Sequence, residues 1–201
     1  MPDSWESFLA DCDACRRCPL GSTRRNAVVC RGAWKAPLMF IGEGPGAEED
    51  ARGKPFVGQA GRLLDLLLEA QGFPESAYHI GNVVKCRPPE NRVPTEEEAA
   101  ACRPLLARQI LLVRPKVVVL LGATAHRYIT GSKEPISKVR GQWTEKNGYH
   151  MLPTFHPAYI LRNDRDRIVL WKDLLSVRAK LEELGFAAPL PDPAAMPSGR
   201  G

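Results

Sequence analysis

The sequence lacks any long apolar run. Its 201 residues contain no stretch of 18 consecutive apolar residues, the length that a membrane-spanning helix needs. The N-terminal segment MPDSWESFLADC is acidic and has no apolar signal core. The sequence also contains no internal repeat. We therefore predict a cytoplasmic protein with no membrane partner, large enough for one sizeable domain.

Both common phosphate-binding loops are also absent, although residues 41–61, IGEGPGAEEDARGKPFVGQAG, are rich in glycine. A P-loop needs G-x-x-x-x-G-K-[ST], but the Gly-Lys pair of this stretch is followed by Pro55. A dinucleotide loop needs G-x-G-x-x-G, whereas residues 42–46 read G-x-G-x-G. The acidic residues 48–50 would repel a phosphate at the start of the next helix. The loop therefore favours a neutral ligand that can form hydrogen bonds.

Charge of neither sign is in strong excess. The formal net charge is +5 and the isoelectric point is about 9.0. This balance permits a nucleic-acid partner without requiring one, and an ordinary basic enzyme fits it equally well.

Cysteine, by contrast, is abundant, with six residues. Disulfides are disfavoured in the cytoplasm, so metal binding is the favoured explanation. Cys12, Cys15 and Cys18 have the spacing C-x2-C-x2-C, and 15 residues separate Cys86 from Cys102. Two cysteines of the first group and the later pair could hold zinc or a [4Fe–4S] cluster. The spacing leaves open which metal binds and whether Cys12 or Cys18 is the partner of Cys15.

Apolar periodicity predicts alternating strands and helices. The expected strands are 37–42, 78–85, 116–122 and 148–155, and the expected helices are 60–72, 96–113 and 165–186. Thr95 and Glu98 form a capping box for the second helix, and Pro104 should kink or divide it. Residues 187–201 are rich in Pro, Ala and Gly, which predicts a disordered tail after a single domain of residues 1–186.

The last helix, 165–186, should bury one apolar stripe at helical spacing. Its expected members are Ile168, Trp171, Leu174, Leu175, Leu181 and the stem of Arg178.

The alternation of strands and helices predicts an α/β sandwich with a mostly parallel sheet. In such sheets, ligands bind beyond the carboxyl ends of the strands. The loop of residues 41–61, the segment 82–92 and HPAYILR (156–162) should therefore lie on one rim and form a site.

The motifs GEGPGAEEDARGKPFVGQAGRLLD, NVVKCRPPENRVP and HPAYILR, in this order and with the cysteines, resemble the family-4 uracil-DNA glycosylases, which are iron–sulfur DNA-repair enzymes. The resemblance extends from about Cys15 to Trp171. It implies a three-layer α/β/α sandwich with a central four-stranded parallel sheet. It also implies a monofunctional hydrolase of base excision repair, which releases uracil from single- and double-stranded DNA, and we expect a monomer.

The resemblance also implies a [4Fe–4S] cluster. By position its ligands would be Cys15, Cys18, Cys86 and Cys102. Cys12 and Cys30 match no ligand position and are interpreted as structural.

The family resemblance assigns the reading of uracil to the rim. Uracil presents an acceptor at O4 and a donor at N3–H, and an Asn amide offers the complementary pair. Asn82 resembles the uracil-reading Asn, and Phe56 resembles the aromatic residue that stacks on the base, beside Gly42 of the loop. The structural alternatives are that Asn82 is a turn residue at the end of a strand and that Phe56 is a core residue. Thymine would be excluded by Glu49, with Glu48 second, unless both are solvated carboxylates.

Catalysis needs a donor at uracil O2, where negative charge develops. His156 is expected to supply it, unless it is a capping or core His. Relatives in other families carry Asp at the place of Gly44, which this chain does not. Glu43 is therefore expected to orient water or to stabilise the oxocarbenium ion.

DNA contacts are expected from two basic segments. Leu161 and Arg162 resemble a minor-groove wedge, although they could simply lead into the last helix. Lys85, Arg87 and Arg92 are predicted to grip backbone phosphates, the alternative being a solvated basic loop.

Two other classes of protein compete with the glycosylase. One is a non-catalytic nucleic-acid-binding module with zinc, which would be colourless, and the other is a redox iron–sulfur protein, which would release no uracil.

Overall fold

The structure is a computed structural model that describes residues 4–186 of the chain. One sheet has the strand order β1-β3-β2-β4-β6-β5. Its inner strands β3, β2, β4 and β6 are parallel, and β1 and β5 pair antiparallel at the two edges. The strands are β1 (Arg31–Gly32), β2 (Leu38–Gly42), β3 (Tyr78–Asn82), β4 (Val117–Leu121), β5 (Thr144–Lys146) and β6 (Tyr149–Thr154). The predicted central parallel sheet is confirmed, and two short edge strands extend it.

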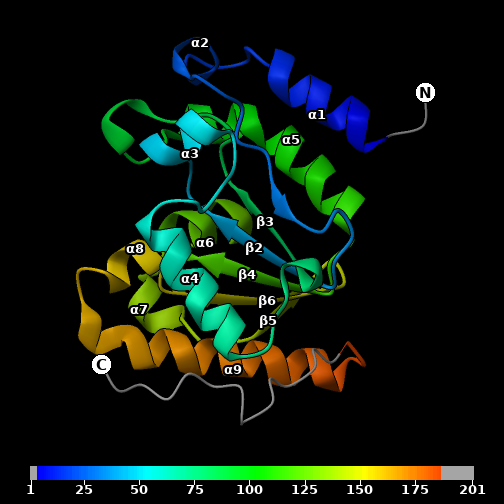
Figure 1. The fold of residues 1–201 in the computed structure, drawn as a ribbon, viewed down its shortest axis with the longest axis vertical. Coiled ribbons are helices and arrows are strands. Elements are labelled where there is room, and N and C mark those ends of the chain that lie inside the picture. Colours follow the sequence, from blue (N-terminus) through cyan, green and yellow to red (C-terminus); the bar gives the residue numbers. More distant parts are fainter. Residues whose placement is uncertain (1–3, 187–201) are drawn as a thin grey trace.

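Helices cover both faces of this sheet, as Figure 1 shows. The helix α1 packs with α5 on one side, and α4 packs with α9 on the other. The helices are α1 (Trp5–Ala14), α2 (Leu20–Thr23), α3 (Ala47–Arg52), α4 (Gln59–Ala70), α5 (Glu96–Val113), α6 (Gly122–Thr130), α7 (Ile136–Val139), α8 (Pro157–Ile160) and α9 (Arg167–Glu183), with short 3-10 turns at Glu75–Ala77, Pro89–Asn91 and Asp164–Asp166. None of the helices in the described part of the chain is long and apolar enough to cross a membrane. The predicted tail, 187–201, lies outside the described residues.

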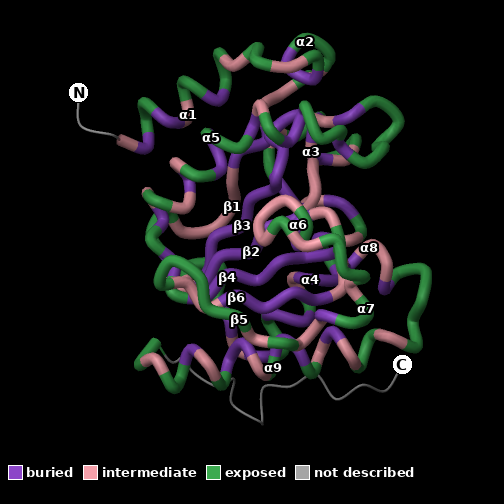
Figure 2. Tube along the Cα trace, turned by 180° about the vertical axis from the view of Figure 1, so that it is seen from behind, coloured by how far each residue is buried: buried purple, intermediate pink, exposed green. Residues whose placement is uncertain are grey.

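The core consists of two apolar clusters, one on each face of the sheet. Figure 2 shows the inner strands β2, β3 and β4 buried along their length, with exposed residues on the outer faces of the helices. Every residue of β2, β3 and β4 is buried. Phe40 packs on the α4 and α9 side, whereas Met39 and Ile41 pack on the α1 and α5 side. Because both faces are covered, these strands are continuous apolar runs rather than alternating ones, and this made them recognisable in the sequence.

The capping box that begins α5 is confirmed. The Thr95 hydroxyl accepts from the Glu98 N–H at 3.2 Å, and the Glu98 carboxylate accepts from the Thr95 N–H at 2.8 Å. Pro104 lies inside α5, which continues through it from Glu96 to Val113, so of the two predicted outcomes, a kink or a division, division of the helix is wrong.

The predicted buried stripe of α9 is confirmed in part, because Leu174, Leu181 and Arg178 are buried and Trp171 packs against the core. Ile168 and Leu175 are 55% and 42% exposed, whereas Leu170 and Val177 are fully buried. The buried stripe runs from Leu170 through Leu174, Val177 and Leu181, with Arg178 beside it. The observed stripe shares Leu174, Arg178 and Leu181 with the predicted one and is rotated towards Leu170 and Val177, so the pattern predicts the helix and part of its inward face, while packing against the sheet decides the rest.

Strand β3 is shorter than predicted and ends at Asn82. The Val83 N–H still donates to the Gly42 carbonyl at 2.9 Å and the Val84 N–H to the Glu43 carbonyl at 3.3 Å, but neither residue belongs to the strand. This early end leaves Asn82 at the carboxyl end of the sheet, beside the end of β2.

Candidate active site

A cleft with a volume of about 690 Å³ lies beyond the carboxyl ends of β2, β3, β4 and β6. The three predicted loops all contribute to it: Glu43 follows β2, Asn82 ends β3, and His156 follows β6. The segment 121–124, after β4, also lines the cleft and was not predicted. The sequence contained a signal for this segment. A glycine directly follows the apolar strand 117–121, and the residues that follow each parallel strand lie at the same rim.

Asn82 is the most buried polar group of the cleft. It is 1% exposed, and its side-chain oxygen Oδ1 has no hydrogen-bond partner among the described residues. A Cβ on Gly42 would lie 2.5 Å from this oxygen and 2.7 Å from the Phe56 ring. The absence of a side chain at residue 42 therefore lets the amide and the ring approach each other. A buried amide oxygen without a partner indicates a ligand that donates a hydrogen bond.

Phe56 is held in an unusual backbone conformation. Its φ is +56°, which bulky residues rarely adopt. The Arg31 guanidinium donates to the Phe56 carbonyl at 2.9 Å, and a Cβ on Gly61 would lie 1.8 Å from that carbonyl oxygen. Gly61, in the first turn of α4, is therefore required for Phe56 to take this position. Such strain is concentrated at functional sites, where the surroundings maintain it.

His156 is the N-cap of α8. Its Nδ1 accepts from the Ala158 N–H at 3.1 Å, so in the neutral ring Nε2 carries the proton. The ring lies beside Phe56, with the ring centroids 5.5 Å apart. Burial, reinforced by the nearby Arg162 cation, lowers the pKa of His156 to about 4. His156 is thus a neutral hydrogen-bond donor at physiological pH.

Glu43 also lines the cleft. Its carboxylate accepts a hydrogen bond from the hydroxyl of Thr124, in the first turn of α6. Gly122, with φ of +90°, begins that helix, and a Cβ there would lie 3.0 Å from the His156 Cβ. The start of α6 thus fixes one carboxylate oxygen and leaves room for the imidazole.

Glu49 lines the cleft while its carboxylate binds the loop itself. Its oxygens accept from the backbone N–H groups of Gly46 (3.1 Å), Val57 (3.1 Å) and Gly58 (2.9 Å). The carboxylate therefore joins the beginning of α3 to the beginning of α4. Glu48 is more exposed and pairs with Arg52 and Arg62 at the surface.

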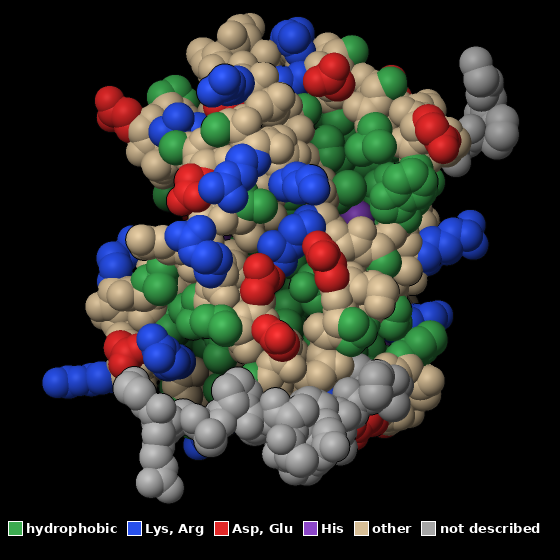
Figure 3. Space-filling model, viewed as in Figure 1, with side chains coloured by type: hydrophobic (Ala, Val, Ile, Leu, Met, Phe, Trp, Pro, Cys, Tyr) green, Lys and Arg blue, Asp and Glu red, His purple; other side chains and the backbone are tan. Residues whose placement is uncertain are grey.

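The residues predicted to contact DNA differ in their environments. Leu161 is 44% exposed, and Arg162 is exposed at the edge of the cleft. Arg87 donates to the Asn91 side chain at 2.8 Å, and Arg92 forms a two-pronged ion pair with Glu98. Figure 3 shows Lys and Arg side chains gathered over α3 and the start of α4 on the face seen there.

The prediction that Lys85 grips a phosphate is wrong. Its side chain is 1% exposed, and its ammonium donates to the Asn82 carbonyl at 2.7 Å and to the Gln109 side chain. A group enclosed in this way cannot reach a DNA backbone.

The cysteines expected to hold a cluster line one small cavity. Cys15, Cys18, Cys86 and Cys102 face it together with Arg17, Arg24 and Lys85. Cys12 and Cys30 do not line it, and burial raises the pKa of both thiols, that of Cys12 to about 12. Among residues 4–186, no three His, Cys, Asp or Glu side chains are arranged to hold a metal ion.

The residues of this cavity nevertheless suit an anionic cluster. The Sγ of Cys86 accepts from the Arg24 guanidinium at 3.1 Å. Burial raises the pKa of Cys102, while the Lys85 ammonium and a hydrogen bond from the Lys85 backbone oppose the rise. The cavity lining contains three cations and no carboxylate, which favours thiolates.

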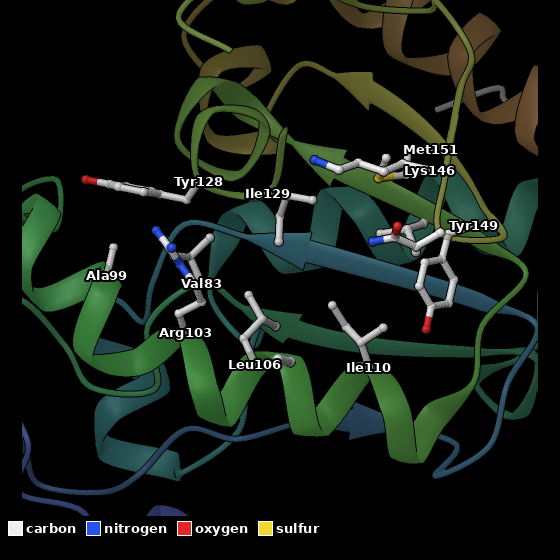
Figure 4. Close-up of a pocket in the computed structure, with 13 residues that line it drawn as sticks. Val83, Ala99, Arg103, Leu106, Ile110, Tyr128, Ile129, Lys146, Tyr149 and Met151 are labelled. Carbon is white, nitrogen blue, oxygen red and sulfur yellow. The ribbon is translucent and has the colours of Figure 1, made fainter. Parts of the chain in front are cut away.

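A second cavity, of about 330 Å³, lies between α5 and the β4–β6 part of the sheet, away from the cleft. Figure 4 shows its mainly apolar wall, with Leu106, Ile110 and Met151, and the cations of Arg103 and Lys146 at its border. It contains neither the buried amide nor the imidazole of the cleft, so we assign the chemistry to the cleft.

Comparison with known proteins agrees with this geometry. The family model of the Uracil DNA glycosylase superfamily matches residues 31–175, which contain the cleft and two of the four cavity cysteines. The chain therefore belongs to the uracil DNA glycosylase superfamily.

Individual relatives refine the assignment. The chain is 47% identical to a type-4 uracil-DNA glycosylase of Thermotoga maritima over 178 residues, covering 85% of this chain and 91% of the relative. It is 46% identical to a type-4 uracil-DNA glycosylase of Saccharolobus solfataricus over 188 residues, covering 89% and 87%. A third, from Sulfurisphaera tokodaii, is 42% identical over 185 residues, covering 88% and 84%. Within the superfamily, the chain is a member of the type-4 family.

Proposed function

We propose that the cleft is where this protein, a uracil-DNA glycosylase of DNA repair, takes up a flipped-out uracil and hydrolyses its N-glycosidic bond. The products are free uracil and an abasic site in the DNA. The observation that carries this assignment of the cleft is the buried Asn82 oxygen without a partner, flanked by an aromatic ring and a neutral imidazole. A base must leave the stack to be read in this way.

Asn82 reads the Watson–Crick edge. Its Oδ1 accepts from uracil N3–H, and its amide N–H donates to uracil O4. Cytosine reverses both polarities, and each buried group left unpaired costs about 1–3 kcal/mol. Phe56 stacks on the base, a contact worth about 1–3 kcal/mol. Gly42 contributes by having no side chain, since a Cβ would occupy the space between the amide and the ring.

His156 and Glu43 act on the reaction itself. As the bond between the sugar C1′ and uracil N1 breaks, its electron pair passes to the uracil, and negative charge builds up on O2. The Nε2–H of His156 donates to O2, and because the ring is neutral the donor needs no change of protonation state. Glu43, fixed through Thr124, orients the water that attacks C1′ or stabilises the positive sugar. The proton that the water loses passes to solvent, and the departing uracil anion takes up a proton from solvent, so that neutral uracil is released.

Glu49 limits the site to uracil. Its carboxylate, held by three backbone N–H groups, borders the cleft as a fixed wall against the thymine methyl group. Glu48 pairs with arginines at the surface and is the weaker candidate.

Binding to DNA uses the exposed edge of the cleft. Leu161 enters the gap left by the flipped nucleotide, and Arg162 and Arg87 contact phosphates. Arg92 would share its guanidinium between phosphate and Glu98. Single- and double-stranded DNA are both substrates, and the protein acts as a cytoplasmic monomer.

The four-cysteine cavity holds a [4Fe–4S] cluster in this proposal. Cys15, Cys18, Cys86 and Cys102 would be the ligands, with Arg24 and Lys85 as cations facing the thiolates. When bound, the cluster would cross-link the segment after α1 to the loop after β3 and to α5. Ligation of this kind is coupled to folding.

A direct assay tests the proposed function. Purified protein is incubated with single- and double-stranded oligonucleotides that contain one uracil, and abasic sites are detected by alkaline cleavage. Matched oligonucleotides with cytosine or thymine at that position are the controls. Cleavage at uracil alone is expected. A brown protein that leaves uracil in place would instead support a redox iron–sulfur protein, and a colourless, inactive protein would support a zinc-containing binding module.

A further inference from the structure

Lys85 carries an ammonium group deep inside the protein. Burying this charge lowers the stability of the fold, so its retention suggests a functional role. The side chain is 1% exposed. Its Nζ donates to the Asn82 main-chain carbonyl at 2.7 Å and to the Gln109 side-chain oxygen. No carboxylate among residues 4–186 forms a salt bridge with it. Burial of a cation that no carboxylate neutralises disfavours folding, so replacement by an apolar residue would be expected unless the ammonium has a function.

The orientation of Gln109 is fixed from its other side. His79 Nδ1 lies 2.7 Å from the Ala33 carbonyl, which can only accept, so this nitrogen carries the ring proton. The other ring nitrogen, Nε2, therefore accepts from the Gln109 amide at 2.9 Å, and the same amide donates to the Val29 carbonyl at 3.0 Å. The amide NH₂ is thereby used up, and the Gln109 oxygen must face Lys85.

Lys85 also faces the cysteine cavity. Lys85 lines that cavity together with Cys86 and Cys102. The ammonium thus lies between the end of β3 and the cysteines, and its two oxygen partners, on Asn82 and Gln109, are both fixed.

We propose that Lys85 is a positioning residue for uracil reading. Held by Gln109, its ammonium anchors the main chain at Asn82, so that the Asn82 amide meets the base, and it serves as the internal cation that faces the cysteine cavity. This inference rests on the proposed role of Asn82 as the reader.

The position of the Lys85 ammonium at the end of β3 explains how it affects the Asn82 amide. Asn82 is the last residue of β3, and beyond Val83 the chain as far as Lys85 is held to its neighbours by only two backbone hydrogen bonds among the described residues, from the Val84 N–H to the Glu43 carbonyl at 3.3 Å and from the Val28 N–H to the Lys85 carbonyl at 2.8 Å. The Asn82 amide must fit between Gly42 and Phe56 with little tolerance. A displacement of about 1 Å at such a site can cost about 10²-fold in rate.

The test compares the full-length variant Lys85→Met with the native protein. Iron content and visible absorption report whether the cluster is bound. The single-turnover rate on uracil-containing DNA at saturating protein, and the salt dependence of affinity for abasic DNA, report on function. We expect the rate to fall roughly 10- to 100-fold, with an unchanged salt slope, because Lys85 touches no phosphate. Excision of cytosine relative to uracil should rise, because the reading amide is less well fixed.

Val113→Ala is the control for loss of stability. Val113 is 1% exposed in the same apolar cluster as Cys86 and Cys102 but lies at the far end of α5. It should lower the melting temperature without lowering the single-turnover rate, measured well below both melting temperatures. An equal loss of rate in both variants would overturn the proposal, as would an unchanged rate or a smaller salt slope for Lys85→Met.

If Lys85→Met fails to fold or to retain iron, Gln109→Met replaces it. That variant keeps the ammonium but removes the group that holds it, so a smaller loss of rate in the same direction is expected. An unchanged rate with the cluster intact would overturn the proposal. If Asn82→Asp excises uracil at the native rate, the role of Asn82 fails instead, independently of Lys85.

Discussion

At the scale of single residues, the cleft combines groups whose neighbours leave them little freedom. The Asn82 amide is enclosed, the His156 ring is oriented by a backbone N–H, and Phe56 is held with a positive φ. Each of these side chains is positioned before a base arrives, which reduces the entropy lost on binding.

Asn82→Asp tests the reading of the base. The new side chain offers an acceptor, or when protonated a single donor, where uracil O4 needs an N–H, so we expect uracil excision to fall at least about 10²-fold. Asn91→Asp is the matched control, since Asn91 lines the same cleft but is exposed. Single-turnover rates decide the matter, and equal rates for the two variants would remove Asn82 from its role.

His156→Ala tests the chemical step separately from binding. Loss of one preorganised donor costs about 10²–10³ in rate, so the single-turnover rate should fall by that factor. Affinity for abasic DNA should change little. A variant that lost affinity but kept its rate would contradict the assignment.

The pH dependence of the native rate provides a further test of His156. Its pKa of about 4 means that the ring is neutral above about pH 5. The part of the single-turnover rate that depends on His156 should therefore stay constant from pH 8 to about pH 5 and change only below that. A histidine with an ordinary pKa would instead give a transition near pH 6.5. Finding such a transition in the native protein, and its loss in His156→Ala, would contradict the prediction.

At the scale of elements, the loop that joins α8 to α9 contains the proposed wedge. Leu161→Ala should reduce excision from double-stranded DNA more than from single-stranded DNA, because only the duplex must be held open. Leu175→Ala is the control, since Leu175 is similarly exposed, at 42%, but lies in the middle of α9. Comparable losses on both substrates for Leu161→Ala would mean that it is not a wedge.

The contact between β3 and α5 should make stability depend on pH. Burial lowers the pKa of His79 to about 4, so the folded state keeps the ring neutral while the unfolded state takes up a proton below about pH 6.5. The stability contributed by this difference is present above pH 6.5 and is lost as the pH falls, by about 3 kcal/mol at pH 4. In urea unfolding, the free energy of unfolding of His79→Gln should fall less steeply between pH 6.5 and 4.5 than that of the native protein. Identical pH dependences in the two proteins would contradict this.

At the scale of the whole molecule, the cysteine cavity ties the N-terminal segment to the sheet. Cys86→Ala should lose iron and stability together, whereas Cys30→Ala, outside the cavity, should keep the iron. Iron content and melting temperature measure the two effects. A native protein that contains zinc, or a Cys86→Ala variant with full iron and an unchanged melting temperature, would contradict the proposed cluster.

The sequence by itself determined the order of the elements and most of the cleft. The strands, the α5 capping box and the placing of Glu43, Asn82 and His156 at strand ends depend on local patterns, because apolar runs and capping residues act within a few positions. Parallel strands then bring their carboxyl ends to one rim.

Only the tertiary structure decided the burial of Lys85, the place of Leu170 and Val177 in the buried face of α9, and the contribution of residues 121–124. The sequence predicts Lys85 to be a surface cation, because its partner Gln109 is 24 residues away and belongs to a different element. The same holds for Glu49, two of whose three backbone partners follow it by eight and nine residues. The packing of elements against one another decides which side chains are buried and which are paired. The sequence pattern within one element does not show which other element packs against it.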